Sequence, residues 1–124
     1  MFNGSKRQSC TSDLEAFETS GRFTINNTTD PDGIVGDFVT SITRADTGDF
    51  LFTFDNTVAE LHYLDAVVYA DADHTCTFAG ITDVEGAGTK TATLHIRTAG
   101  SAADPANNVM VGFFLRGKLT TRTR

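Results

Sequence analysis

The chain has 124 residues, of which 40% are hydrophobic and 21% are charged, and its formal net charge is −6. This length suits one domain with a real core, and the balance excludes a disordered tail and a membrane-spanning protein. Thr is the commonest residue, Trp is absent, and Lys and Glu are scarce, so the composition favours strands over helices.

The charges are unevenly distributed along the chain. Residues 8–115 carry all 16 acidic residues but only four bases, which gives this part a charge of 4 − 16 = −12. The remaining bases lie near the two ends, at Lys6, Arg7, Arg116, Lys118, Arg122 and Arg124. Either these ends dock on an acidic neighbour, such as another copy of the chain, or they are ordinary solvated tails. An acidic body argues against a nucleic-acid partner.

The beginning of the chain lacks the apolar segment of a secretory signal, and no run approaches the length of a membrane span. We therefore expect synthesis in a host cytoplasm and no membrane partner. The two cysteines, Cys10 and Cys76, are too few for a disulfide framework and are expected to be reduced.

In chain order, residues 1–20 are predicted to form an extended N-terminal arm, with either a short helix or a first strand after Thr11. Strands and turn signals then alternate. The predicted strands are Arg22–Ile25, Gly36–Arg44, Asp49–Phe54, His62–Asp71, His74–Thr82, Thr89–Thr98 and Val109–Arg116. The predicted turns and loops are Asp30–Gly33, Asp46–Gly48, Asp71–Asp73, Glu85–Gly88 and Ala99–Asn108.

This pattern predicts an all-β fold, an antiparallel, jelly-roll-like β-sandwich over residues 21–116, followed by a short basic C-terminal tail over residues 117–124. Alternation places Phe50, Phe52 and Phe54 on one face of their strand, and Ala92, Leu94 and Ile96 on one face of another.

The last predicted strand, Val109–Arg116, is apolar on both faces. Val111, Phe113 and Leu115 alternate with Met110 and Phe114. Either Met110 and Phe114 lie beneath a loop or the arm, or they face a partner subunit.

The sequence contains no recognisable combination of a nucleophile, a base and an acid for catalysis. His62 and His74 flank one predicted hairpin and, with Asp71 and Asp73, could hold a divalent cation, although acidic turns are common for backbone reasons alone. His95 is expected on an exposed strand face, and Cys76 is expected to be a small buried apolar residue. We predict no enzyme activity and no catalytic, cofactor-binding or metal-binding residue.

Two stretches resemble structural proteins of tailed bacteriophages. Asp37–Phe54, with the sequence DFVTSITRADTGDFLFTF, resembles a hairpin recurrent in those proteins. Thr89–Arg97, the Ala102–Pro105 loop and Val109–Arg116 are similar to the way such domains end. The resemblance spans residues 37–116 and implies a virion protein, either a capsid decoration (cement) protein or a fibre or knob domain. Such proteins are commonly β-sandwiches or jelly rolls and often trimeric.

A fibre protein carries a long shaft that this sequence lacks, so the resemblance favours a decoration protein located in the virion. Its partners are then the major capsid protein or other virion subunits, together with further copies of itself. We expect the partner interface to include residues of the arm, the last strand and the tail: Phe2, Lys6, Arg7, Met110, Phe114, Lys118, Arg122 and Arg124.

The competing prediction is a fibre-tip, knob or tail module that binds a receptor or glycan. It requires exposed aromatic side chains on a shallow face or loop, for which Tyr63 and Tyr69 are candidates.

Overall fold

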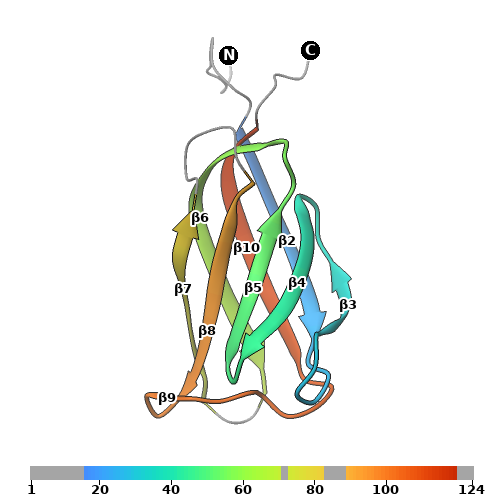
Figure 1. Cartoon of the computed structure of the whole chain (residues 1–124), viewed down its shortest axis with the longest axis vertical. Helices are drawn as coiled ribbons and strands as arrows, with labels where there is room; N and C mark the ends of the chain where they lie inside the picture. The colour runs from blue at the N-terminus through green and yellow to red at the C-terminus, as the bar shows by residue number, and fades with distance from the viewer. Residues whose placement is uncertain (1–15, 71–72, 83–88, 120–124) are drawn as a thin grey trace, which may run out of the picture.

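A computed structural model describes residues 16–70, 73–82 and 89–119 of the chain. All regular structure in these residues is β-strand (Figure 1). The strands are β2 (Ala16–Thr24), β3 (Asp32–Val35), β4 (Val39–Asp46), β5 (Asp49–Phe54), β6 (Val58–Tyr69), β7 (Thr75–Thr82), β8 (Thr91–Thr98), β9 (Ser101–Ala102) and β10 (Met110–Leu119).

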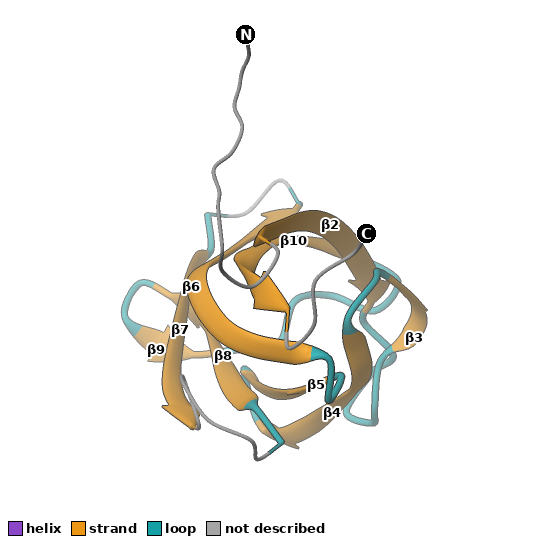
Figure 2. Cartoon of the chain, turned by 90° about the horizontal axis from the view of Figure 1, so that it is seen from above, coloured by secondary structure: helices purple, strands orange, loops and turns teal. Residues whose placement is uncertain are grey.

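The strands form two antiparallel sheets that face each other, as Figure 2 shows along the strand direction. One sheet has the order β3-β2-β10-β6, and the other has the order β4-β5-β8-β7 with β9 paired to β8. The predicted all-β sandwich is therefore confirmed, whereas the jelly-roll connectivity stays a prediction. β10 is an inner strand of its sheet, paired with β2 on one side and β6 on the other.

The core between the sheets is built from phenylalanine. Phe52 on β5 is fully buried, and its ring centroid lies 5.1 Å from Phe113 on β10 and 5.9 Å from Phe23 on β2. Within its own sheet it also contacts Phe78 at 5.1 Å. These tilted and edge-to-face contacts join the two layers in a geometry that aromatic pairs prefer.

The period-two pattern of the sequence explains this core. β5 alternates buried and half-buried residues along its whole length, with Phe50, Phe52 and Phe54 inside, as predicted. β8 does the same with Ala92, Leu94 and Ile96. Successive side chains of a strand point to opposite faces, so each strand contributes every second residue to the core.

Polar contacts tie three turns together at one end of the sandwich. The Arg44 guanidinium donates from Nη2 to Asp104 Oδ2 at 2.8 Å, and the backbone N–H of Gly48 donates to Asp104 Oδ1 at 2.8 Å. The backbone N–H of Arg44 also donates to Asp30 Oδ1 at 2.9 Å. Gly48 has φ +71°, and a Cβ there would lie 2.5 Å from the Ile96 carbonyl oxygen, so only glycine fits this turn.

Several predicted boundaries differ from the structure. β2 begins at Ala16 and β10 continues to Leu119, so the expected limits of the arm at residue 20 and of the tail at residue 117 both fall inside strands. Of the two alternatives near the start, the strand is observed from Ala16 onward, and Thr11 lies outside the described residues. β3 and β9 were not predicted, because Pro31 and Gly33 favoured a turn over Asp30–Gly33 and polar residues favoured a loop over Ala99–Asn108. The predicted turn is wrong at Asp32 and Gly33, which begin β3.

Replacing the central aromatic residue tests this core. We expect Phe52→Ala to lower the free energy of unfolding by about 3–5 kcal/mol, since it removes a fully buried ring and leaves a cavity. Thr53→Ala, on the other face of the same strand, should change it by no more than about 1 kcal/mol. Urea unfolding of both variants measures the difference, and equal small losses would contradict the described packing.

Candidate functional site

The two faces of β10 differ in what covers them. Val111, Phe113 and Leu115 point into the core and are buried. The alternate residues Met110 and Phe114 lie on the outer face of the sheet, where Met110 is 38% exposed and Phe114 is half-buried. The Phe114 ring contacts Tyr63 of β6 edge-on, at a centroid distance of 5.9 Å. The apolar outer side of the last strand is thus a surface feature.

The register of the sheet shows which residues share this surface. Gly112 pairs with Arg22 of β2 and with Val67 of β6, and Phe114 pairs with Ser20 and Asp65. Paired residues lie on the same face of a sheet. We call this surface the β10 face: Glu18, Ser20 and Arg22 from β2; Val35 from β3; Tyr63, Asp65, Val67 and Tyr69 from β6; Met110, Gly112, Phe114, Arg116 and Lys118 from β10.

The β10 face concentrates exposed apolar area. Seven large apolar side chains are exposed among the described residues, and five of them lie here: Val35, Tyr63, Val67, Tyr69 and Met110. Tyr69 is 60% exposed and Val67 is 52% exposed. A cluster of this kind on a monomer is characteristic of an interaction site.

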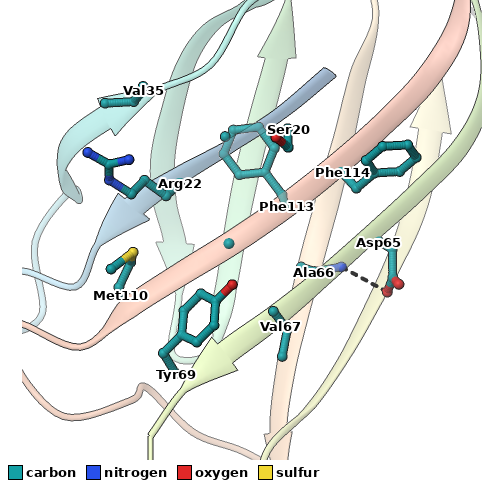
Figure 3. Close-up of a pocket in the computed structure, with 12 residues that line it drawn as sticks. Ser20, Arg22, Val35, Asp65, Ala66, Val67, Tyr69, Met110, Phe113 and Phe114 are labelled. Carbon is teal, nitrogen blue, oxygen red and sulfur yellow. Dashed lines mark hydrogen bonds between the residues drawn. The ribbon is translucent and has the colours of Figure 1, made fainter. Parts of the chain in front are cut away.

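A shallow hollow of about 560 Å³ lies in this face, with Tyr69, Val67, Met110 and Phe114 around it (Figure 3). Gly112 lies in its lining, and a Cβ at that position would be 3.1 Å from the Tyr69 ring. The missing side chain at Gly112 therefore creates the hollow and lets the Tyr69 ring lie against the backbone.

Charged groups flank the hollow on two sides, with Arg22 on the β2 side and Asp65 on the β6 side of β10 (Figure 3). The Arg22 side chain has no hydrogen bond or ion pair with any described residue. Asp65 Oδ1 accepts the Ala66 backbone N–H at 2.9 Å, and its Oδ2 accepts the Tyr63 hydroxyl at 3.3 Å. At one end of the face, Arg116 lies 3.8 Å from Glu18 in an exposed, loose ion pair.

Three of the eight residues predicted for the partner interface lie together on this face: Met110, Phe114 and Lys118. The other five lie outside the described residues: Phe2, Lys6, Arg7, Arg122 and Arg124. The prediction missed Arg22, Asp65 and Val67 because their place beside β10 depends on pairing between distant strands. Tyr63 and Tyr69, the candidates for glycan binding, lie on the same face as Met110 and Phe114.

A polar cluster lies on the outer face of the other sheet. His95 Nδ1 is 2.8 Å from Asp49 Oδ1, and Arg97 Nη1 donates to the same oxygen at 3.1 Å. Partial burial alone would raise the pKa of Asp49, but the hydrogen bonds and charges of His95 and Arg97 outweigh it and hold that pKa below its ordinary value. His95 is thus a paired side chain rather than the solvated one that was expected.

The thiol of Cys76 does not lie beside this histidine. Cys76 pairs with Ile96 and packs toward the core, so its thiol and His95 lie on opposite faces of the sheet. Burial raises the pKa of the Cys76 thiol, and the charge of Asp65 adds to the effect. Such a thiol is a poor nucleophile at neutral pH.

The described members of the candidate metal cluster, His62, His74 and Asp73, form no metal-binding group. His62 lies 2.7 Å from Glu60, whereas His74 Nδ1 lies 3.0 Å from the Thr98 hydroxyl. The described residues contain no group of three or more potential metal ligands, and Asp71 lies outside them.

Comparison with protein-family models, with curated protein sequences and with solved structures finds no match for this chain. In the described part of the chain, no helix has the length and apolar character needed to cross a membrane.

The Asp49 cluster makes a pH-dependent contribution to stability. Because the folded-state pKa of Asp49 lies below the unfolded value of about 3.9, its stabilisation is complete above that value and is lost as the pH falls through the folded-state pKa. We expect Asp49→Asn to lower the free energy of unfolding at pH 7 by about 1–2 kcal/mol, with a smaller loss at pH 3. Urea unfolding at both pH values tests this, and an equal loss at pH 3 would refute the ionic contribution.

Proposed function

We propose that this chain is a non-enzymatic structural protein of a virion, most simply a capsid decoration protein that stabilises a shell through contacts between neighbouring subunits. The observation that carries the proposal is the β10 face, an exposed apolar surface in the middle of a rigid sheet. The sequence resemblance over residues 37–116 to structural proteins of tailed bacteriophages supports placing the protein in a virion.

The composition of the β10 face suits a protein partner. Tyr, Met, Phe and Arg are enriched where protein interfaces gain most of their affinity, and Tyr69, Met110, Phe114 and Arg22 surround one hollow. Covering the exposed apolar area contributes about 25 cal/mol per Å² before the costs of association. A bound neighbour then stabilises the assembled state by mass action.

The basic ends support a second contact. Lys118 near the end of β10 pairs with Ala16 at the start of β2, so the start of β2 and the end of β10 lie side by side at one end of the sandwich (Figure 1). The segments that precede β2 and follow β10 carry Lys6, Arg7, Arg122 and Arg124. An acidic surface on the major capsid protein is the complementary partner.

A second candidate function, a fibre-tip or tail module that binds a receptor or glycan, is favoured by one observation. Tyr63 and Tyr69 are 48% and 60% exposed on a shallow face, where aromatic rings can stack on sugars. Trp is absent from the chain, and the neighbouring Met110, Val67 and Phe114 suit a protein surface better than a sugar.

The β10 face can be tested by cosedimentation with undecorated shells of the parent virus. We expect Phe114→Asp to weaken binding at least about tenfold, because it places a charge in the centre of an apolar contact. Leu51→Asp is the matched control, since Leu51 is equally half-buried on the outer face of the opposite sheet. It should bind like the wild type.

Circular dichroism establishes that both variants fold. Equal binding by folded Phe114→Asp and wild type would overturn the role of the β10 face. Absence of shell binding by the wild type, together with saturable glycan binding that Tyr69→Ala abolishes, would favour the second candidate function.

The basic tail predicts salt-dependent binding. Removing residues 120–124 deletes Arg122 and Arg124 but keeps all of β10, and should weaken shell binding and flatten its dependence on salt. The control replaces Thr120, Thr121 and Thr123 with Ala, which keeps both charges. Cosedimentation at 50 mM and at 300 mM salt measures the effect, and a salt profile identical to the wild type would exclude an electrostatic tail contact.

A further inference from the structure

The β10 face holds a cationic and an anionic side chain that form no ion pair with each other or with another described residue. Arg22 lies on β2 and Asp65 lies on β6, with β10 between them. Two strand spacings, about 9.6 Å, separate the strands that carry these residues. Arg22 has no ionic partner among the described residues, and Asp65 has no cationic one. As far as the described residues show, each charge can therefore pair with a molecule that covers the face.

A surface with opposite charges on either side of an apolar strip is complementary to itself. In a two-fold contact both molecules use the same patch, so the patch must carry both members of every pair across the interface. We propose that the neighbour packed against the β10 face is a second copy of this chain, related by a two-fold axis that runs along β10. This inference rests on the proposed function in one respect, that the β10 face is a protein contact.

The sheet register gives the pairs that this axis creates. Rotation about β10 brings β2 of one copy over β6 of the other, so Arg22 comes to lie over Val67 of the second copy. Asp65 and Tyr69 are the next outward residues on either side of Val67, each about 6.8 Å along the strand. An arginine side chain is long enough to cover this distance. Arg22 of one copy can therefore bind the Asp65 carboxylate of the other copy and also approach its Tyr69 ring.

From Met110 to Phe114 the strip along the axis is apolar in both copies, whereas Arg116 and Lys118 lie beyond it toward one end of β10. Met110 and Phe114 meet their own counterparts there, and Gly112 adds no side chain between them. The two β10 strands can therefore approach closely, with the exposed Tyr69 rings covering the sides of the contact.

The area of the β10 face indicates how tightly the proposed dimer should associate. The strands β2, β3, β6 and β10 have 9, 4, 12 and 10 residues, and at about 3.4 Å along and 4.8 Å across the sheet for each residue they present roughly 600 Å² to a partner. This lies toward the lower end of specific interfaces, so we expect a dimer that dissociates in the micromolar range.

Charge reversal provides the test. Sedimentation velocity of the full chain between about 5 and 500 μM should show a reversible dimer. Arg22→Asp and Asp65→Arg should each weaken dimerisation about tenfold or more, because each places like charges opposite one another. The double variant restores opposite charges and should dimerise within about threefold of the wild type. Asp73→Arg is the control, since this exposed acid lies outside the β10 face and its reversal should have no effect.

The outcomes separate this inference from the proposed function. A wild type that stays monomeric to 500 μM, a trimer insensitive to either reversal, or a double variant no better than the single ones would overturn the two-fold contact. Should Phe114→Asp still abolish shell binding in that case, the β10 face binds a different virion subunit and the proposed function stands. A rescued dimer without any shell binding would support the contact while removing the virion role.

Discussion

The structure depends on one aromatic contact between its layers, the edge-to-face packing of Phe52 on β5 against Phe113 on β10. Phe23 from β2 lies against both rings, so three strands from two sheets meet at this point. Because Phe113 is committed to the core, its neighbours Gly112 and Phe114 must face outward. The alternation of side chains that places Phe113 in the core therefore also places the apolar residue Phe114 on the outer face of the sheet.

The fold could be predicted wherever local pattern determines structure. Strict alternation in Asp49–Phe54 and Thr91–Thr98 identified both strands and their inward residues, since side-chain direction in a strand has a period of two. Pairing between distant strands could not be predicted, because nothing local specifies that β10 inserts between β2 and β6. The Arg44–Asp104 ion pair was missed for the same reason, since 60 residues separate its members.

The residues of the candidate site likewise include some that local sequence could identify and others that depend on strand pairing. Met110 and Phe114 were recognised because the last strand is apolar on both faces, a property visible within eight residues. Arg22, Asp65 and Tyr69 join them only through the register of three strands. Gly112 carried no signal in the sequence, although its lack of a side chain shapes the hollow. The composition of an interface is thus partly local, whereas its geometry is a property of the sheet.

The strand order β3-β2-β10-β6 has a consequence for synthesis on the ribosome. Four of the chain's nine described strands belong to this sheet, and its inner strand β10 is the last of the nine to be made. Until β10 emerges, β2 and β6 each lack a partner along the edge that it later occupies, and the inner faces of the sandwich have no complete second layer. Contacts between such distant segments slow folding and leave unpaired strand edges open to association. The described sandwich is consequently most exposed to misassembly and chaperone binding just before β10 leaves the exit tunnel.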